Sequence, residues 1–376
     1  MEIRKGPVED MGMNKLLSFY RNKRVLVTGH TGFKGTWLTS TLLRAGAEVC
    51  GYSLGVPTAP GLYDIADVTS GIRDVRGDIR DLDHLQRVFT EFRPEIVFHL
   101  AAQPIVRESY RNPVYTYETN VMGTVNVLEC IRQTDSVRSA VIITTDKVYK
   151  NNEWVWGYRE DEPLDGFDPY SNSKSCAELA VHSYRNSFFQ NDDTLAVSTA
   201  RAGNVIGGGD FASDRIIPDC VRAMESGNGL IEVRNPFSTR PYQHVLEPLA
   251  AYMMIAEKQW EDRQYADYYN VGPDDCDCVT TGDLVSLFCK KWNQDLSDGL
   301  PRASWESHAE TDAPHEASFL KLDSSKIKSV IGYRPRWHID ECMEKTVIFS
   351  KRYLTDAKGI PDEMDREIEE YFNVEQ

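Results

Sequence analysis

Short apolar runs alternate with helical patterns through the first half of the chain. Arg24–Thr28 (RVLVT) has the continuous apolar character of a buried strand, and the segment after it changes to helical spacing. The pattern then predicts further strands at 48–52, near 75, and at 96–100, 139–145 and 195–200, with helices at 81–92, at 114–134 and from Pro169 onward. Strands that alternate with helices in this way indicate a parallel sheet covered on both faces.

After about residue 203 strands and helices no longer alternate regularly, and the loops become rich in Pro, Asp and Gly. Helical spacing recurs at 216–226, 247–262 and 282–292, and short strand patterns occur at 231–234 and 268–271. The sequence therefore predicts an α/β protein with a Rossmann-like, doubly wound parallel sheet and a smaller, discontinuous C-terminal α/β domain. We expect the first domain to span 22–203 with parts of 240–272, the second to comprise 204–239 and 273–350, and 1–21 to be an N-terminal extension.

Length and charge narrow the possible functions. A chain of 376 residues favours two domains over one. Its 42 basic and 58 acidic side chains give a net charge of −16, which argues against binding to nucleic acid or to anionic membranes because the overall field repels phosphate. A phosphorylated ligand would then have to be held by a few local cations or backbone amides.

The chain has no apolar run of 18 residues and no apolar stretch of signal-peptide length near its start, so we expect a cytoplasmic protein without a membrane span. The eight cysteines show no paired metal spacing. Cys276 and Cys278 form an isolated C-x-C, and we interpret the cysteines as reduced thiols with no metal site.

A glycine-rich turn, TGHTGFKG at 28–35, follows the first strand and precedes a helix. Gly29, Gly32 and Gly35 permit a tight turn, close approach of the backbone to a pyrophosphate, and close packing of helix on strand. The helix N-terminus then offers free N–H groups to phosphates. In this context the turn favours dinucleotide binding over a purely structural role, and His30 and Lys34 could add positive charge near the pyrophosphate or a 2′-phosphate.

The choice of dinucleotide rests on the end of the second strand. Ser53 stands where NAD enzymes often have an acidic residue and NADP enzymes a basic one. Asp78 and Ile79, after the third strand, are placed to meet the adenine edge. We expect NAD rather than NADP.

Tyr170 and Lys174 lie at positions i and i+4 at the start of a helix, so both project from one face. A Lys ammonium beside a phenol lowers the pKa of the Tyr hydroxyl and makes it a usable base for an alcohol proton. The alternative is a Tyr and Lys on a solvated helix face, but the glycine turn upstream favours the catalytic interpretation.

Several runs together carry a family resemblance: TGHTGFKG, HLAAQ (99–103), Asn120, TTDK (144–147), YSNSK (170–174) and RAGNVIGGGD (201–210). Over about residues 22–350 the chain resembles the extended short-chain dehydrogenase/reductases that act on nucleotide sugars. The runs TTDKVY, DPYSNSK, DRIIPD and RPYQHVLEP are most similar to the 4,6-dehydratases of CDP-glucose within this group.

The residues after the fifth strand separate the subfamilies. In epimerases of this group the corresponding run resembles Ser-Ser-x or Thr-Ser-x. In the dTDP-glucose dehydratases it is Thr-Asp-Glu, with Asp as general acid and Glu as general base. This chain has Thr145, Asp146 and Lys147. The inverting UDP-N-acetylglucosamine dehydratases share Thr-Asp-Lys but typically lack the Tyr found here at 170. The resemblance implies Asp146 as acid, and Lys147 as base if it is neutral, while a simple loop ion pair is the alternative.

The resemblance also implies the binding residues. The implied cofactor-binding residues are Gly29, His30, Gly32, Phe33, Lys34, Gly35, Ser53, Asp78, Ile79, Ala101, Ala102, Gln103, Asn120, Tyr170, Lys174 and Arg201. The implied substrate-binding residues are Asn204, Arg215, Arg234, Arg240, Asn270 and His315. Each of the latter could instead be a surface or loop polar group, and Asp312-Ala313-Pro314 departs from the Arg that precedes the His in the dTDP-glucose enzymes.

The resulting expectation is an NAD-dependent hydro-lyase that converts CDP-glucose to CDP-4-keto-6-deoxyglucose for deoxysugar synthesis. Relatives pair through helices that correspond to 114–134 and 170–190, which implies a homodimer. The alternatives are a dehydratase for another nucleotide-glucose, a 4-epimerase, or a nucleotide-sugar sensor without activity. A sensor would have little reason to keep Thr145, Asp146, Tyr170 and Lys174 together.

Overall fold

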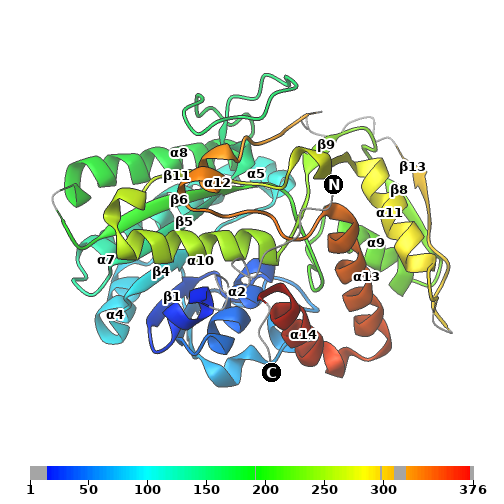
Figure 1. Cartoon of the computed structure of the whole chain (residues 1–376), viewed down its shortest axis with the longest axis horizontal. Coiled ribbons are helices and arrows are strands. Elements are labelled where there is room, and N and C mark those ends of the chain that lie inside the picture. Colours follow the sequence, from blue (N-terminus) through cyan, green and yellow to red (C-terminus); the bar gives the residue numbers. More distant parts are fainter. Residues whose placement is uncertain (1–14, 191, 297–298, 309–318, 373–376) are drawn as a thin grey trace.

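A seven-stranded parallel sheet forms the centre of the computed structural model, which describes residues 15–190, 192–296, 299–308 and 319–372 (Figure 1). Its strand order is β11-β6-β5-β4-β1-β2-β3. The strands are β1 (Arg24–Thr28), β2 (Glu48–Ser53), β3 (Arg73–Arg76), β4 (Ile96–His99), β5 (Ser139–Thr145), β6 (Ala196–Ala202) and β11 (Tyr268–Val271). Since every pair is parallel, all seven strands present their carboxyl ends at one edge of the sheet.

Alternating side chains of the central strands feed two separate cores. Val25 and Val27 of β1 pack into one core, while Leu26 packs into the other. The first core is covered by α2 (Phe33–Arg44) and α10 (Leu246–Glu261), and the second by α4 (Leu82–Phe92), α7 (Gly123–Arg132) and α8 (Pro169–Tyr184). Both faces are therefore buried, which explains the uninterrupted apolar strands in the sequence.

The remaining elements form a smaller region beside the sheet, at the right of Figure 1. Its helices are α9 (Ile216–Glu225), α11 (Thr281–Asn293) and α13 (Ile339–Thr355), while α12 (Ser325–Val330) lies beside β11 at the edge of the sheet. Its strands, in two-stranded sheets, are β7 (Val205–Ile206), β8 (Leu230–Val233), β9 (Thr239–Pro241), β10 (Gln243–His244), β12 (Cys278–Thr280) and β13 (Ser304–Ser307). The first core continues into this region without a break, through residues such as Val233 and Phe288.

The predicted fold class is confirmed, and each predicted strand of the sheet is present. The predicted helix at 114–134 consists of α6 (Pro113–Tyr117), a π-helical turn at Glu118–Met122, and α7. The helices that were not predicted include α3 (Leu62–Ile65), α5 (Val106–Arg111), α12, α13 and α14 (Ile360–Phe372), the last of which packs against α2. Within the described residues, no helix has the length and apolar character that crossing a membrane requires.

Candidate functional site

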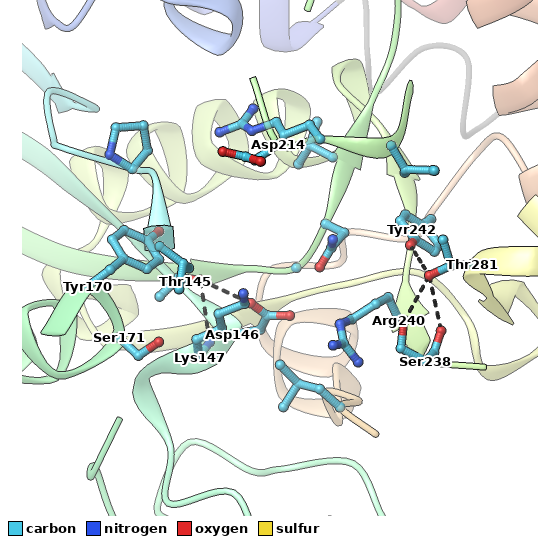
Figure 2. Close-up of a pocket in the computed structure, with 18 of the residues that line it drawn as sticks. Thr145, Asp146, Lys147, Tyr170, Ser171, Asp214, Ser238, Arg240, Tyr242 and Thr281 are labelled. Atoms are coloured by element: carbon cyan, nitrogen blue, oxygen red, sulfur yellow. Dashed lines mark hydrogen bonds between the residues drawn. The ribbon is translucent and has the colours of Figure 1, made fainter. Parts of the chain in front are cut away.

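A cavity of about 960 Å³ opens at the carboxyl ends of β5 and β6, between the sheet and the smaller region. This volume lies in the range of small-molecule sites in proteins. Figure 2 shows Thr145 and Tyr170 on one side of the cavity and Arg240, Tyr242 and Thr281 on the other. The cavity is thus lined by both parts of the molecule.

The run Thr145-Asp146-Lys147 lines the cavity where β5 ends. The Thr145 hydroxyl donates to Asp146 Oδ1 at 3.0 Å and accepts the Lys147 backbone N–H at 3.4 Å (Figure 2). Asp146 is 2% exposed, and no described residue donates a hydrogen bond to its buried Oδ2. Burial raises the pKa of this carboxyl, while the nearby charges of Lys147 and Arg240 partly oppose the rise. Asp146 is therefore suited to hold a proton inside the cavity.

Tyr170 owes its position to the start of α8. The Asp168 side chain caps the helix by accepting the backbone N–H of Ser171 at 3.0 Å and its hydroxyl at 2.6 Å, and Pro169 occupies the first turn. Tyr170 then faces the cavity, and Lys174 follows one turn later in the buried interior.

The proton affinities of this pair differ from the prediction. Burial raises the pKa of Tyr170 to about 12, although a hydrogen bond with the Thr145 side chain opposes the rise. The Lys174 ammonium donates to the Ile143 carbonyl at 3.1 Å, and burial lowers its pKa to about 8. Burial is therefore the largest cause of both pKa shifts.

The glycine turn has the shape that a pyrophosphate requires. Gly29 has a φ of +77°, and a Cβ there would lie 2.7 Å from the Ala101 nitrogen, while a Cβ on Gly35 would overlap the Gly29 carbonyl oxygen. Gly32 precedes α2, and no side chain caps this helix. Its first N–H groups are consequently available to an anion, and the cradle fits a dinucleotide.

His30 differs from the expectation of a cation facing the pyrophosphate. Its ring is fully buried, with Nδ1 2.9 Å from Ser53 Oγ and Nε2 3.0 Å from Asp74 Oδ1. Burial lowers the pKa of His30, although Asp74 opposes this change. The ring therefore ties the turn to β2 and β3, and Ser53 is engaged in the same contact.

Phe33 and Lys34, the first residues of α2, line the cavity. Burial is the main cause that lowers the pKa of Lys34 to about 8. Repulsion from Arg215 and Lys174 lowers this pKa further, while the charge of Asp146 opposes the shift. Lys34 thus belongs to the charge cluster of the cavity.

The other residues implied in cofactor binding shape the loop after β4. Asn120 accepts the Gln103 N–H at 2.8 Å and donates to the Gln103 carbonyl at 3.0 Å and to Ser173 Oγ at 2.9 Å. The Gln103 side chain is likewise bonded internally, to Thr116. Asn120 therefore holds this loop against α8.

Ala101 and Ala102, in the same loop, are half-buried. Asp78 and Ile79 lie beyond β3 at the carboxyl end of the sheet. Ile79 is buried, while the Asp78 carboxylate is bonded to Arg80, which lowers the pKa of Asp78.

Four of the residues implied in substrate binding line the cavity: Asn204, Arg215, Arg234 and Arg240. Arg215 pairs with Asp210 at 2.9 Å, and Arg234 pairs with Asp214 at 2.9 Å. His315 lies outside the described residues.

Arg201 and Asn270 are not among the residues that line the cavity. Asn270 is fully buried outside the cavity, where its Oδ1 accepts the Tyr149 hydroxyl at 2.6 Å and its Nδ2 donates to the carbonyls of Tyr158 and Asp323. Arg201 lies beside it in the adjacent strand and donates to Tyr149 Oη at 2.8 Å. Both side chains are hydrogen-bonded within the protein.

Some cavity residues were not predicted from the sequence. Arg107 lies on α5, a helix too short to show a clear period, and Asp214 has a φ of +59°. Tyr242 and Thr281 meet by a hydrogen bond of 3.0 Å between their hydroxyls. Of these four, Asp214 and Tyr242 lie in runs that carry the family resemblance, DRIIPD and RPYQHVLEP, and that position is the signal that could have identified them.

Cys276, Asp277 and His338 bring three ligand-type atoms within 4.8 Å of one another. Asp277 already accepts His338 Nδ1–H and the backbone N–H of Ile339, both at 2.9 Å, at the start of α13. Capping of that helix accounts for the cluster.

Fold and site together define the class of protein, a dinucleotide-binding enzyme of the short-chain dehydrogenase/reductase type. A family profile described as GDP-mannose 4,6 dehydratase matches residues 26–346. The chain belongs to this family of nucleotide-sugar enzymes, which confirms the resemblance seen in the sequence.

Individual relatives agree with this assignment. The CDP-glucose 4,6-dehydratase of Salmonella typhimurium is 47% identical over 342 residues, covering 90% of this chain and 93% of its own. The UDP-glucose 4-epimerase of Thermus thermophilus, solved with NAD, is 26% identical with a TM-score of 0.73, covering 87% of this chain and 99% of its own. The dTDP-glucose 4,6-dehydratase of Bacillus anthracis, also solved with NAD, has a TM-score of 0.71 at 19% identity, covering 88% and 97%, and shares the fold.

Proposed function

We propose that the protein is a CDP-glucose 4,6-dehydratase, which converts CDP-glucose to CDP-4-keto-6-deoxyglucose and water. The observation that carries the proposal is the buried Asp146 carboxyl, which has an unpartnered oxygen in the cavity beside Thr145 and Tyr170. Similarity to the Salmonella typhimurium enzyme over nearly the whole chain supports the choice of substrate.

The first step is proton removal from the sugar 4-hydroxyl. Tyr170 is the base, and the Thr145 hydroxyl beside it orients the same oxygen. When bound in the glycine cradle, NAD would supply a hydride acceptor for C4 and later a donor for C6. The neighbouring Lys174 ammonium favours the phenolate electrostatically.

The second step eliminates water across C5 and C6. The 4-ketone acidifies the hydrogen on C5, and Lys147 in its neutral form takes this proton. Protonated Asp146 gives its proton to the departing C6 hydroxyl, which leaves as water. Lys147 then returns its proton to C5 as C6 gains the hydride.

The Thr145 hydroxyl can restore the proton balance between Tyr170 and Asp146 after each turnover. Over one turnover Tyr170 gains a proton from the 4-hydroxyl and Asp146 loses one to the leaving water. Thr145 is hydrogen-bonded to Asp146 Oδ1 at 3.0 Å and contacts Tyr170, so its hydroxyl offers a route for returning the proton.

A 4-epimerase is the enzyme alternative, and the inert nucleotide-sugar sensor is the non-enzyme alternative. Inversion at C4 needs the Tyr170 base but no acid aimed at C6. Burying a carboxyl oxygen without a hydrogen-bond partner is energetically unfavourable. Neither alternative would use the buried Asp146 acid, so neither explains why the protein tolerates this unfavourable burial. This favours dehydration.

We propose NAD as the cofactor, a homodimer as the assembly and the cytoplasm as the location. Ser53 carries no charge for a 2′-phosphate, and the relatives solved with NAD support the same choice. Val114, Met122, Leu179 and Phe188 expose more than half of their surface on the helices of the expected dimer contact. Exposed apolar side chains of this kind suit a contact with a second copy.

The test is incubation with CDP-, dTDP-, GDP- and UDP-glucose carrying deuterium at C4. We expect CDP-glucose to be the best substrate and deuterium to appear at C6 of a 4-keto-6-deoxy product. Inversion at C4 alone would identify an epimerase, and tight binding without turnover would identify a sensor. Preference for another nucleotide would replace CDP-glucose as the substrate.

A further inference from the structure

Glu178 is a buried acid behind the catalytic helix that the reaction described above does not use. It is 1% exposed and lies one turn after Lys174 on α8. Its Oε1 accepts the Thr144 hydroxyl at 2.5 Å, and its Oε2 accepts the Thr199 hydroxyl at 2.8 Å and Arg201 Nη2 at 2.9 Å. The carboxylate is thus fixed between α8 and the two strands that end at the cavity.

This fixed carboxylate faces Lys174 along the helix. Residues four apart lie on the same helix face, so Glu178 is the next side chain below the ammonium that donates to the Ile143 carbonyl. Burial lowers the pKa of Lys174 to about 8, and the charge of Glu178 opposes that shift.

The other titratable groups near Lys174 do not stabilise its charge. Lys34 on α2 carries the same sign and repels it. His99 on β4 is held neutral, because burial and then Lys174 lower its pKa to about 3. Burial raises the pKa of Tyr170, on the same helix, to about 12, so its hydroxyl supplies little negative charge near neutral pH and the phenolate is the reactive minor form. Among the described residues, Glu178 is therefore the anion that favours the ammonium form.

We propose that Glu178 is a positioning residue that keeps Lys174 charged and aligned beneath Tyr170 during the reaction. The inference rests on the proposed function, since the ammonium is needed when Tyr170 takes the proton of the sugar hydroxyl. Arg201 fixes the carboxylate, and this explains why an arginine without access to the cavity lies directly behind the site.

The competing explanation is that Glu178 and Arg201 are only a buried ion pair of the fold. Breaking a buried pair destabilises a protein whichever partner is changed. A structural role therefore predicts loss of stability in variants of either residue, with no specific effect on the pH dependence of activity.

The test compares Glu178→Gln with Arg201→Lys. Both disturb the pair, but only the first removes the negative charge that faces Lys174, and Arg201→Lys keeps the positive charge while losing the fork of hydrogen bonds. For Glu178→Gln we expect the alkaline midpoint of the kcat/KM profile for CDP-glucose to fall by about one pH unit or more. For Arg201→Lys we expect a lower Tm and an alkaline midpoint close to that of the wild type.

A second measurement makes the test independent of turnover. The titration of Lys174 is followed by NMR of ¹³C-labelled lysine in the free protein, with Lys174→Met used to assign the signal. The titration midpoint of Lys174 should fall in Glu178→Gln. It should stay unchanged in Arg201→Lys and in Glu178→Asp, since Asp keeps the negative charge. If Glu178→Gln does not fold, Glu178→Gln combined with Arg201→Met, which removes both charges, should show the same fall.

An unchanged Lys174 midpoint in the variants without Glu178, or an equal shift in Arg201→Lys, would overturn the inference. Failure of the wild type to turn over CDP-glucose would instead overturn the proposed function. The NMR titration separates these two outcomes, because it measures the coupling between Glu178 and Lys174 without a substrate.

Discussion

Replacing Asp146 by Asn should separate oxidation of the sugar from its dehydration. Asn has nearly the same shape, and its side-chain oxygen can still accept the Thr145 hydroxyl that now donates to Oδ1 at 3.0 Å. The substitution removes only the acidic proton and the charge, and burial already disfavours that charge. We therefore expect the variant to fold and to bind its ligands.

The size of the effect follows from the role of a general acid. Such a group contributes about 10²- to 10⁴-fold to a rate, or about 3 to 5 kcal/mol of the activation barrier. The Oδ2 atom of Asp146 has no hydrogen-bond partner among the described side chains, so no nearby donor is aligned to take over its role. We expect formation of the 6-deoxy product to slow by about 100-fold or more, while C4 oxidation continues.

The assay is a single-turnover reaction with CDP-glucose deuterated at C4, with the 4-ketone and the 4-keto-6-deoxy product quantified separately. Asp135→Asn, which breaks an exposed pair with Arg93, serves as the control. Formation of the deoxy product by Asp146→Asn within about tenfold of the wild-type rate would refute the role of Asp146, because a general acid at that position would then be unnecessary.

Three further changes test other parts of the site. Lys147→Ala should slow exchange of the C5 hydrogen with solvent by about 100-fold, and undiminished exchange would show that another group is the base. Gly35→Ala should weaken NAD binding by about 10- to 100-fold in calorimetry because its Cβ would overlap the Gly29 carbonyl, whereas Gly55→Ala, in open space, should bind normally. Asn270→Ala should lower the free energy of unfolding in urea by about 1 to 3 kcal/mol with little change in KM, and a large rise in KM would restore its predicted role in substrate binding.

The central strands were predictable because they are buried and carry apolar runs, whereas β3 has the single apolar residue Val75 between charged neighbours. The glycine turn and the pair Tyr170 and Lys174 were recognisable because their roles depend on local spacing. By contrast, α5 has only six residues, and the π-helical turn before α7 interrupts the period of its neighbours. Short or irregular helices leave too few turns for an apolar pattern to show.

Arg201 and Asn270 show why sequence reasoning about the site was incomplete. Arg201 adjoins the cavity residue Ala202 in the chain, and Asn270 lies opposite Arg201 in the register of β6 and β11. Successive side chains of a strand point to opposite faces, so proximity in sequence does not decide which residue reaches the ligand. Asn204 lies two residues beyond the end of β6 and does line the cavity.

His30 shows a second limit, which concerns charge. A histidine in a phosphate-binding turn suggests a cation, yet its ring is buried between Ser53 and Asp74, which lies on a different strand. The sequence does not reveal that β3 would bring Asp74 next to the turn. The direction in which a side chain points, and therefore its proton affinity, depends on these tertiary neighbours.

The net charge of −16 and the binding of a diphosphate are compatible because the cavity pairs its cations with acids. Arg215 is held by Asp210 and Arg234 by Asp214, each at 2.9 Å. Each arginine is thereby oriented before a ligand arrives, and its partner limits the cost of holding a charge in a half-buried position. An arginine so held still has further N–H groups to offer a phosphate, since the guanidinium carries five. Local orientation of a few arginines thus provides what the overall field of this acidic protein opposes.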